Sequence, residues 1–201
     1  MFLLYQIKYN KMKKAIIVHG WDGRPQHQWY PWLKRELKKR GFKVQVPQMP
    51  NTSEPEMNAW TSKLKKIARN TDKNMILIGH SVGCQTILRY MEKLSEKVKI
   101  KKCIFVAPWI HLDKQTIEDE GPEVIEIARP WMETPINWKK VKKHCKNFVC
   151  IFSDNDYYVP LSDSKLFKKN LNAKIIILKK KGHFIEYDKV FKLPEILQYI
   201  E

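Results

Sequence analysis

The sequence predicts an α/β fold, in which a doubly wound, mostly parallel six-stranded sheet carries helices on both faces and a small lid. Short apolar runs rich in β-branched residues alternate with longer amphipathic runs along the 201 residues, which is the order of a βαβ protein. Several short runs are hydrophobic at every position, as expected for strands that helices cover on both faces. No repeat or Gly/Ser linker interrupts the alternation, so we expect one domain over residues 1–201.

Six runs have the length and composition of strands. They lie at residues 14–19, 42–46, 74–78, 103–107, 148–152 and 174–178. Amphipathic periodicity predicts helices at residues 28–40, 54–70, 82–95, 162–170 and 189–200. Right-handed crossovers between parallel strands then make a doubly wound open sheet the economical topology.

Two segments depart from this alternation. Residues 109–146 form a longer connection than an ordinary crossover and contain acidic residues, prolines and tryptophans. We expect a crossover helix plus a modest lid over the strand ends, where loops of an α/β sheet hold ligands. Residues 1–11 precede the first convincing strand, and we expect either a disordered extension or an effect of the choice of start site at Met1 rather than Met12.

The composition restricts the class of protein. The net charge of +17 comes mainly from lysines spread over nearly every polar segment, whereas a phosphate-binding surface would favour the forked guanidinium group of arginine. A solvated surface is therefore favoured over nucleic-acid binding. No apolar run approaches the roughly 20 residues that span a bilayer. The four cysteines form no CxxC pair, so we expect buried, reduced thiols, no metal site and a cytoplasmic location.

The most specific motif is the G-x-S-x-G run Gly79-His80-Ser81-Val82-Gly83. A buried strand leads into it and an amphipathic helix leads out, which is the setting that a nucleophile elbow requires. The serine occupies a strained turn, and glycines two positions away on either side let the helix and strand pass closely. The motif predicts Ser81 as a nucleophile at a helix N-terminus, where the Val82 amide can donate to an oxyanion.

A serine nucleophile needs a base and an acid from elsewhere in the chain. His183, in a loop after the last strand, is the predicted base. The chain order Ser, Asp, His of this elbow type places the acid after the preceding strand, where Asp154 and Asp156 both stand. Asp156 is our prediction, and Asp154 is the alternative.

Further residues are predicted to surround the substrate. The first strand runs into a glycine-containing loop in which the amide of Trp21 is the predicted second donor to the oxyanion. Trp109 and Trp131 are predicted to line an apolar acyl pocket, with core packing as an equal alternative. His80, next to the nucleophile, is expected beside the substrate or in a local hydrogen bond. The lysines at positions 179–181 precede His183, which suggests attraction of anionic substrates.

These residues lie in segments that resemble the α/β-hydrolase superfamily, and more narrowly the small single-domain serine hydrolases grouped with the retinoblastoma-binding serine hydrolase and its bacterial esterase-like relatives. The resemblance lies in IIVHGWDGRPQHQWYPWLKREL, GHSVGC, FSDNDYYVPLSDS and KGHF, which together span most of the chain. It implies a minimal α/β-hydrolase fold with Ser81, Asp156 and His183 as the triad. Tyr157 stands where many members have proline, which keeps Asp154 open as the acid.

The sequence thus predicts a carboxylesterase-like serine hydrolase that cleaves an ester, thioester or amide bond of a small acyl substrate through a covalent acyl-enzyme. No metal or organic cofactor is implied. The alternative is a protein-interaction module on a hydrolase scaffold, with a protein partner and little or no catalysis, because a fold alone does not fix a function.

Overall fold

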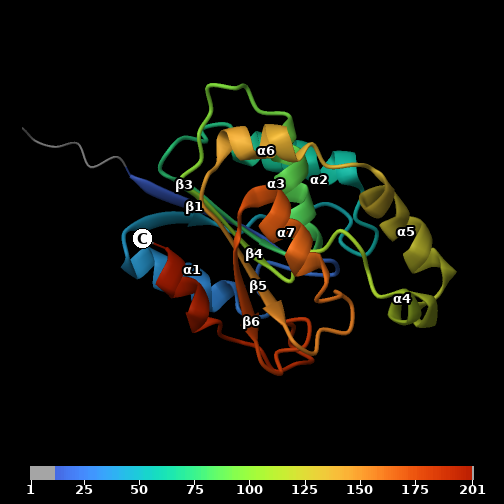
Figure 1. Ribbon diagram of the computed structural model, residues 1–201. Helices are drawn as coiled ribbons and strands as arrows, with labels where there is room; N and C mark the ends of the chain where they lie inside the picture. Colours follow the sequence, from blue (N-terminus) through green and yellow to red (C-terminus); the bar gives the residue numbers. More distant parts are fainter. Residues whose placement is uncertain (1–11, 201) are drawn as a thin grey trace, which may run out of the picture.

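One six-stranded sheet organises the protein in a computed structural model, which describes residues 12–200 (Figure 1). Its strands lie in the order β2-β1-β3-β4-β5-β6, and every neighbouring pair is parallel. The strands are β1 (Lys13–Val18), β2 (Phe42–Gln45), β3 (Met75–His80), β4 (Lys102–Val106), β5 (Phe148–Ser153) and β6 (Lys174–Leu178). The predicted fold class is confirmed, and the described part of the sheet is parallel throughout.

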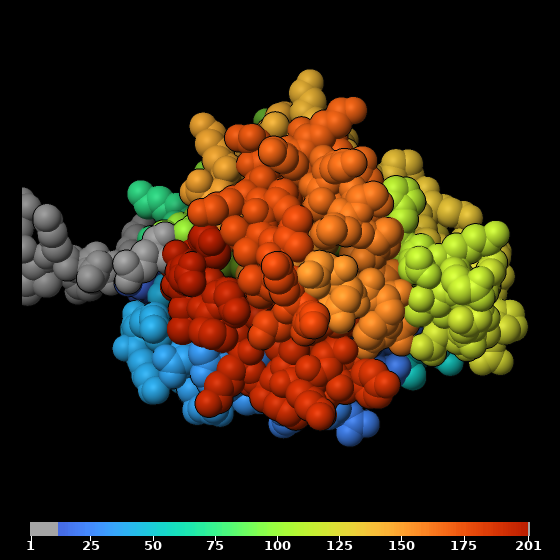
Figure 2. Space-filling model, turned by 60° about the horizontal axis from the view of Figure 1, so that its bottom comes forward, coloured from blue at the N-terminus to red at the C-terminus, as the bar shows by residue number. Residues whose placement is uncertain are grey.

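Helices cover both faces of the sheet. Helix α1 (Tyr30–Lys39) lies on one face together with the C-terminal 3₁₀ helix η1 (Pro194–Tyr199), and Figure 2 shows their blue and red surfaces side by side. The other face carries α2 (Met57–Ile67), α3 (Val82–Glu92), α6 (Trp138–His144) and α7 (Asp163–Leu171). The chain adds β2 on one side of β1 and then β3 to β6 on the other side. The carboxyl ends of β1 and β3 therefore flank the topological switch point, where α/β sheets bind ligands.

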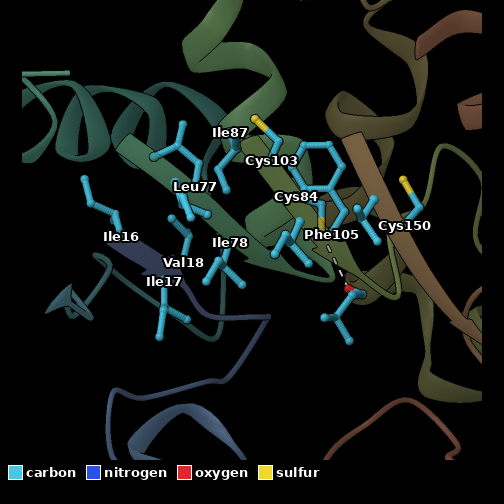
Figure 3. Packing of buried hydrophobic residues seen from close by; sticks show 14 of the residues in the cluster. Ile16, Ile17, Val18, Leu77, Ile78, Cys84, Ile87, Cys103, Phe105 and Cys150 are labelled. Carbon is cyan, nitrogen blue, oxygen red and sulfur yellow. Dashed lines mark hydrogen bonds between the residues drawn. The ribbon is translucent and has the colours of Figure 1, made fainter. Parts of the chain in front are cut away.

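The hydrophobic core includes the region where β1, β3 and α3 meet. Every residue of β3 is buried, and Ile16, Val18, Leu77 and Ile87 are in the same cluster (Figure 3). The predicted state of the cysteines is confirmed, because all four are buried and free of disulfides. Burial raises the pKa of the Cys84 thiol well above its usual value, so this thiol is neutral and packs as a small apolar group.

Two predicted segments differ from the structure. The helix predicted at residues 189–200 is reduced to η1, because Leu193 precedes Pro194 and a residue before proline is driven out of the helical region. The long connection at residues 109–146 contains three helices: α4 (Lys114–Glu120) and α5 (Pro122–Glu133), which project to one side, and α6, which returns to the sheet. The extension predicted at residues 1–11 lies outside the described residues.

Arg89 of α3 holds this long connection in place. Its guanidinium group is buried and donates to the carbonyl oxygens of Trp131 at 3.3 Å, Thr134 at 2.5 Å and Pro135 at 2.8 Å. Carbonyls at the end of a helix have no intrahelical donor, so Arg89 satisfies the end of α5 from inside the core.

We expect Arg89→Met to lower the free energy of unfolding by about 2–4 kcal/mol, because buried carbonyls lose charged donors. Urea denaturation measures the change. The matched control is Arg129→Met on the outer surface of α5, where ion pairs with Glu126 and Glu133 are half-exposed. Its expected effect is below about 1 kcal/mol. Equal effects in the two variants would contradict the role assigned to Arg89.

Candidate active site

A strained turn at Ser81 joins β3 to α3. Ser81 has φ 51° and ψ −124°, a conformation that costs an L-residue about 1–3 kcal/mol. The flanking glycines make the turn possible. A side chain at Gly79 would place its Cβ 2.8 Å from the backbone of Cys84, and one at Gly83 would overlap Val18 O and lie 2.6 Å from His19 O. The first turn of α3 therefore rests directly on the end of β1.

The turn places the Ser81 hydroxyl at the wall of a cavity of about 250 Å³ at the carboxyl edge of the sheet. Trp109, which follows β4, donates from Nε1 to Ser81 Oγ at 3.3 Å. His183 lines the same cavity. The structure thus brings the predicted nucleophile and the predicted base to one cavity. Within residues 12–200, Ser81 Oγ has its hydrogen bond with Trp109 and none with His183.

Asp156 and His183 are in direct contact. His183 Nδ1 lies 3.0 Å from both carboxylate oxygens of Asp156, and these side chains are almost fully buried. Oδ1 of Asp156 also accepts the amides of Tyr158 and Val159 at 3.0 Å. These bonds orient the carboxylate, and the carboxylate in turn orients the imidazole so that Nε2 is the ring nitrogen left to accept a proton.

Asp154, the alternative acid, has a different role. Its Oδ1 accepts the amide of Lys180 at 2.7 Å. Ser153 Oγ and Asn155 Oδ1 accept the next two amides, from Lys181 and Gly182, each at 3.0 Å. The end of β5 and the loop after it therefore hold the backbone of the loop after β6, and of the two aspartates Asp156 is the one that reaches the imidazole of His183.

His80 contacts the backbone of the predicted base, His183. Its Nε2 lies 2.8 Å from His183 O, and its Nδ1 lies 2.6 Å from the hydroxyl of Tyr30, which also accepts the Gly20 amide at 3.2 Å. Burial, followed by repulsion from His183, holds the pKa of His80 well below its usual range. The ring is therefore neutral, with Nε2–H donating to the His183 carbonyl and Nδ1 accepting from Tyr30. Tyr30 was not predicted as a site residue, since no motif marks it.

The loop after β1 contains a free donor. The amide of Gly20 donates to Tyr30, and the amide of Asp22 donates to Thr52 O at 2.9 Å. Within residues 12–200 the Trp21 amide between them donates to no protein group, while the Trp21 indole donates to Ser53 O at 2.8 Å and fixes the loop. Val82 is the first residue of α3, so its amide has no intrahelical acceptor.

The long connection closes the cavity with apolar side chains. Leu112, Ile117 and Val124 line it, and Glu120 of the same segment accepts a hydrogen bond from Tyr158 OH at 2.6 Å. Trp131, which was predicted to line an acyl pocket, does not line the cavity. Its indole is buried and donates to Pro55 O at 2.7 Å. Trp131 therefore packs in the core, which is the alternative that its sequence position left open.

Charge in the cavity has the opposite sign to that of the whole chain. None of the described lining residues is lysine or arginine, and the lysines at positions 179–181 lie outside the cavity. Asp22 and Glu120 line it instead. Burial raises the pKa of Asp22, Arg24 opposes the shift, and Glu120 adds to it.

Residues 12–200 show neither a candidate metal site nor a candidate membrane-spanning helix. No three histidine, cysteine, aspartate or glutamate side chains there come together in a group that could hold a metal ion. No helix of this part of the chain has the length and apolar character needed to cross a membrane.

A parallel sheet with a strained serine turn at its switch point defines an α/β hydrolase. Among solved structures, the chain is similar to the ydeN gene product of Bacillus subtilis, with a TM-score of 0.83 and 25% identity over 94% of this chain and 98% of that one. Est1E of Butyrivibrio proteoclasticus, solved with ferulic acid, shares the fold with a TM-score of 0.67 and 18% identity over 96% of this chain and 92% of that one.

Sequence comparison gives the family. The chain belongs to the serine hydrolase family, whose model matches residues 15–201. The putative hydrolase YdeN of Bacillus subtilis is 26% identical over 90% of this chain and 91% of its own length. Serine hydrolase RBBP9 of Rattus norvegicus is 27% identical over 85% of this chain and 87% of its own length. The predicted family resemblance is confirmed.

The elbow yields a stability prediction. Gly83→Ala should lower the free energy of unfolding by about 3 kcal/mol or abolish folding, because the added methyl group meets backbone atoms of β1 that no side-chain rotation can move. Thermal and urea unfolding measure the effect. Gly41→Ala is the control: Gly41, unlike Gly83, has positive φ, but no atom lies within 4 Å of the added methyl group, so the expected cost is that of the backbone conformation, about 1 kcal/mol. A tolerated Gly83→Ala would show that α3 and β1 are not in contact.

The buried histidines yield a pH prediction. Burial lowers the pKa of both His80 and His19, so the unfolded chain binds protons below about pH 6.5 that the folded chain does not. Stability should be fully present above that pH and fall on acidification, by up to about 1.4 kcal/mol per pH unit for each ring. Urea midpoints between about pH 7.5 and 5.5 test this, and His80→Asn should flatten the slope. An unchanged slope in His80→Asn would contradict the neutral ring.

Proposed function

We propose that the protein is a carboxylesterase-like serine hydrolase that cleaves an ester, thioester or amide bond of a small acyl substrate through a covalent acyl-enzyme. Ser81 is the nucleophile, His183 the general base and Asp156 the acid that orients it. The observation that carries the proposal is the convergence of the Ser81 turn and the Asp156–His183 pair on one cavity. Its volume of about 250 Å³ and its apolar walls favour a small acyl group.

The first half of the reaction acylates the enzyme. Ser81 Oγ bonds to the carbonyl carbon, its proton passes to Nε2 of His183, and the π electrons of the carbonyl move onto its oxygen. The amides of Trp21 and Val82 are the proposed donors to that oxyanion, since neither has a protein acceptor within residues 12–200 and both lie at the elbow or beside it. Collapse of the intermediate restores the carbonyl and expels the leaving group, which takes the proton from His183.

The second half releases the acid. Water gives a proton to His183 and bonds to the acyl carbon, and Ser81 Oγ then leaves and is reprotonated by His183. Asp156 stabilises the imidazolium ion in both halves. The cycle needs neither a metal nor an organic cofactor. We place the enzyme in the cytoplasm on the ground of its four free, buried thiols.

A fluorophosphonate probe tests the proposal. The wild type should be labelled and Ser81→Ala should not. Absence of labelling in folded wild-type protein would overturn catalysis and favour the alternative, an interaction module on a hydrolase scaffold.

The acid is tested by a matched pair of substitutions. Asp156→Asn should lower kcat for an activated ester by about 10³–10⁴-fold, because the imidazole loses its orienting carboxylate. Asp154→Asn keeps an oxygen for the Lys180 amide and should retain most of the activity. Steady-state kinetics with esters of increasing acyl length measure both variants. A larger loss in Asp154→Asn than in Asp156→Asn would reverse the assignment of the acid.

A further inference from the structure

The indole of Trp109 touches the oxygen atom on which the proposed reaction depends. Trp109 Nε1 donates to Ser81 Oγ at 3.3 Å, and both side chains are buried, at 1% and 6% exposure. The acceptor of this bond is a serine oxygen that the reaction uses, whereas the indoles of Trp131 and Trp60 donate to the backbone carbonyls of Pro55 and Pro50. A hydrophobic wall alone would not require an N–H group at this atom.

The segment that carries Trp109 is fixed by two other buried side chains. Gln85 of α3 donates from Nε2 to Trp109 O at 3.0 Å. Asp163, at the start of α7, accepts the next two amides, from Ile110 at 2.6 Å and His111 at 2.8 Å. Gln85 and Asp163 are 0% and 1% exposed. Carboxylate–amide bonds of this kind are charge-assisted, so the position of the indole is set before any substrate arrives.

The bond has a chemical consequence for Ser81. A hydroxyl oxygen has two lone pairs and one hydrogen, and the indole occupies one lone pair. The hydrogen is then kept from the direction of the indole and stays available to an acceptor such as His183, which lines the same cavity. A donor also binds a negatively charged oxygen more strongly than a neutral one, so the indole favours loss of the hydroxyl proton.

We propose that Trp109 is a catalytic residue in addition to the triad, and that its indole N–H orients Ser81 Oγ and stabilises the negative charge that this oxygen gains during proton transfer. This inference rests on the proposed function of Ser81. The Trp109 indole acts at two points. The first is when Oγ gives its proton to His183 and bonds to the carbonyl carbon, and the second is when the bond from Oγ to the acyl carbon breaks and Oγ takes the proton back. The oxyanion donors serve the carbonyl oxygen, so their role is separate.

The test compares Trp109→Phe with Trp131→Phe. Each substitution removes one buried indole N–H and keeps an aromatic ring, and both tryptophans are 1% exposed, but only Trp109 contacts Ser81. Trp109→Phe should lower kcat for an activated ester and the rate of fluorophosphonate labelling by about 10-fold, with KM nearly unchanged. Trp131→Phe should lose stability while keeping its labelling rate.

The pH profile distinguishes the proposed role from a structural one. Trp109→Phe should lower the plateau of kcat without moving its midpoint, because the base and its carboxylate partner are unchanged. A shifted midpoint would indicate displacement of His183 and would overturn the proposal, as would unchanged or faster labelling of Trp109→Phe. Failure of the proposed function itself would appear separately, as wild-type protein that is not labelled.

A second measurement needs no active variant. In ¹H–¹⁵N spectra of the wild-type protein, the Trp109 indole signal is identified by its absence in Trp109→Phe. Phosphonylation replaces the hydroxyl with an ester oxygen, a weaker acceptor, so this signal should move upfield. The Trp131 indole signal should keep its position. An unmoved Trp109 signal in fully labelled protein would show that the indole does not bind Oγ.

Discussion

The contact between the first turn of α3 and the end of β1 is the constraint on which the site depends. Gly83 lies against the carbonyls of Val18 and His19 with no room for a methyl group. This approach fixes the Ser81 turn in a conformation that the residue would not adopt alone. Val82 begins the same turn of α3, and Gly20 of the loop after β1 lies against the Ser81 side chain, so the two proposed oxyanion donors come from segments that this contact brings together. The buried strand β3 and its apolar neighbours supply the stability that such a junction requires.

The other half of the site depends on backbone amides held by side chains. At the end of β5 and in the loop after it, three consecutive residues, 153–155, bind the amides of 180–182, and Asp156 then binds the imidazole. The two aspartates therefore differ in what they hold, although they stand two residues apart in the same loop. Local sequence could not separate them, because the difference arises from contacts with a segment 26–28 residues away. His80 adds a third support, through a ring that burial keeps neutral.

The fold was predictable where one local signal dominates. Continuous β-branched runs identified the six strands, and the glycines and serine of the elbow identified the turn between β3 and α3. Prediction failed where a contact between distant segments determines the role of a side chain. Tyr30 and His80 are 50 residues apart and carry no shared pattern. Trp109 and Trp131 are both buried tryptophans of the same connection, yet one donates to the nucleophile and the other to the carbonyl of Pro55. The apolar periodicity of the last segment also concealed the effect of Pro194 on the residue before it.

Charge distribution separates the surface of the protein from its site. Pairs of lysines occupy the last turns of α1, α2, α6 and α7, where they oppose the partial negative charge of the helix ends. Part of the net charge of +17 is therefore accounted for by helix stability. The cavity, in contrast, is lined by Asp22 and Glu120 and by no described lysine or arginine. Because surface charges are screened over about 8–10 Å in physiological salt, the groups that a bound substrate meets are those of the cavity wall. The net charge of this chain is thus a poor guide to its substrate, and the carboxylates and indole beside Ser81 are a better one.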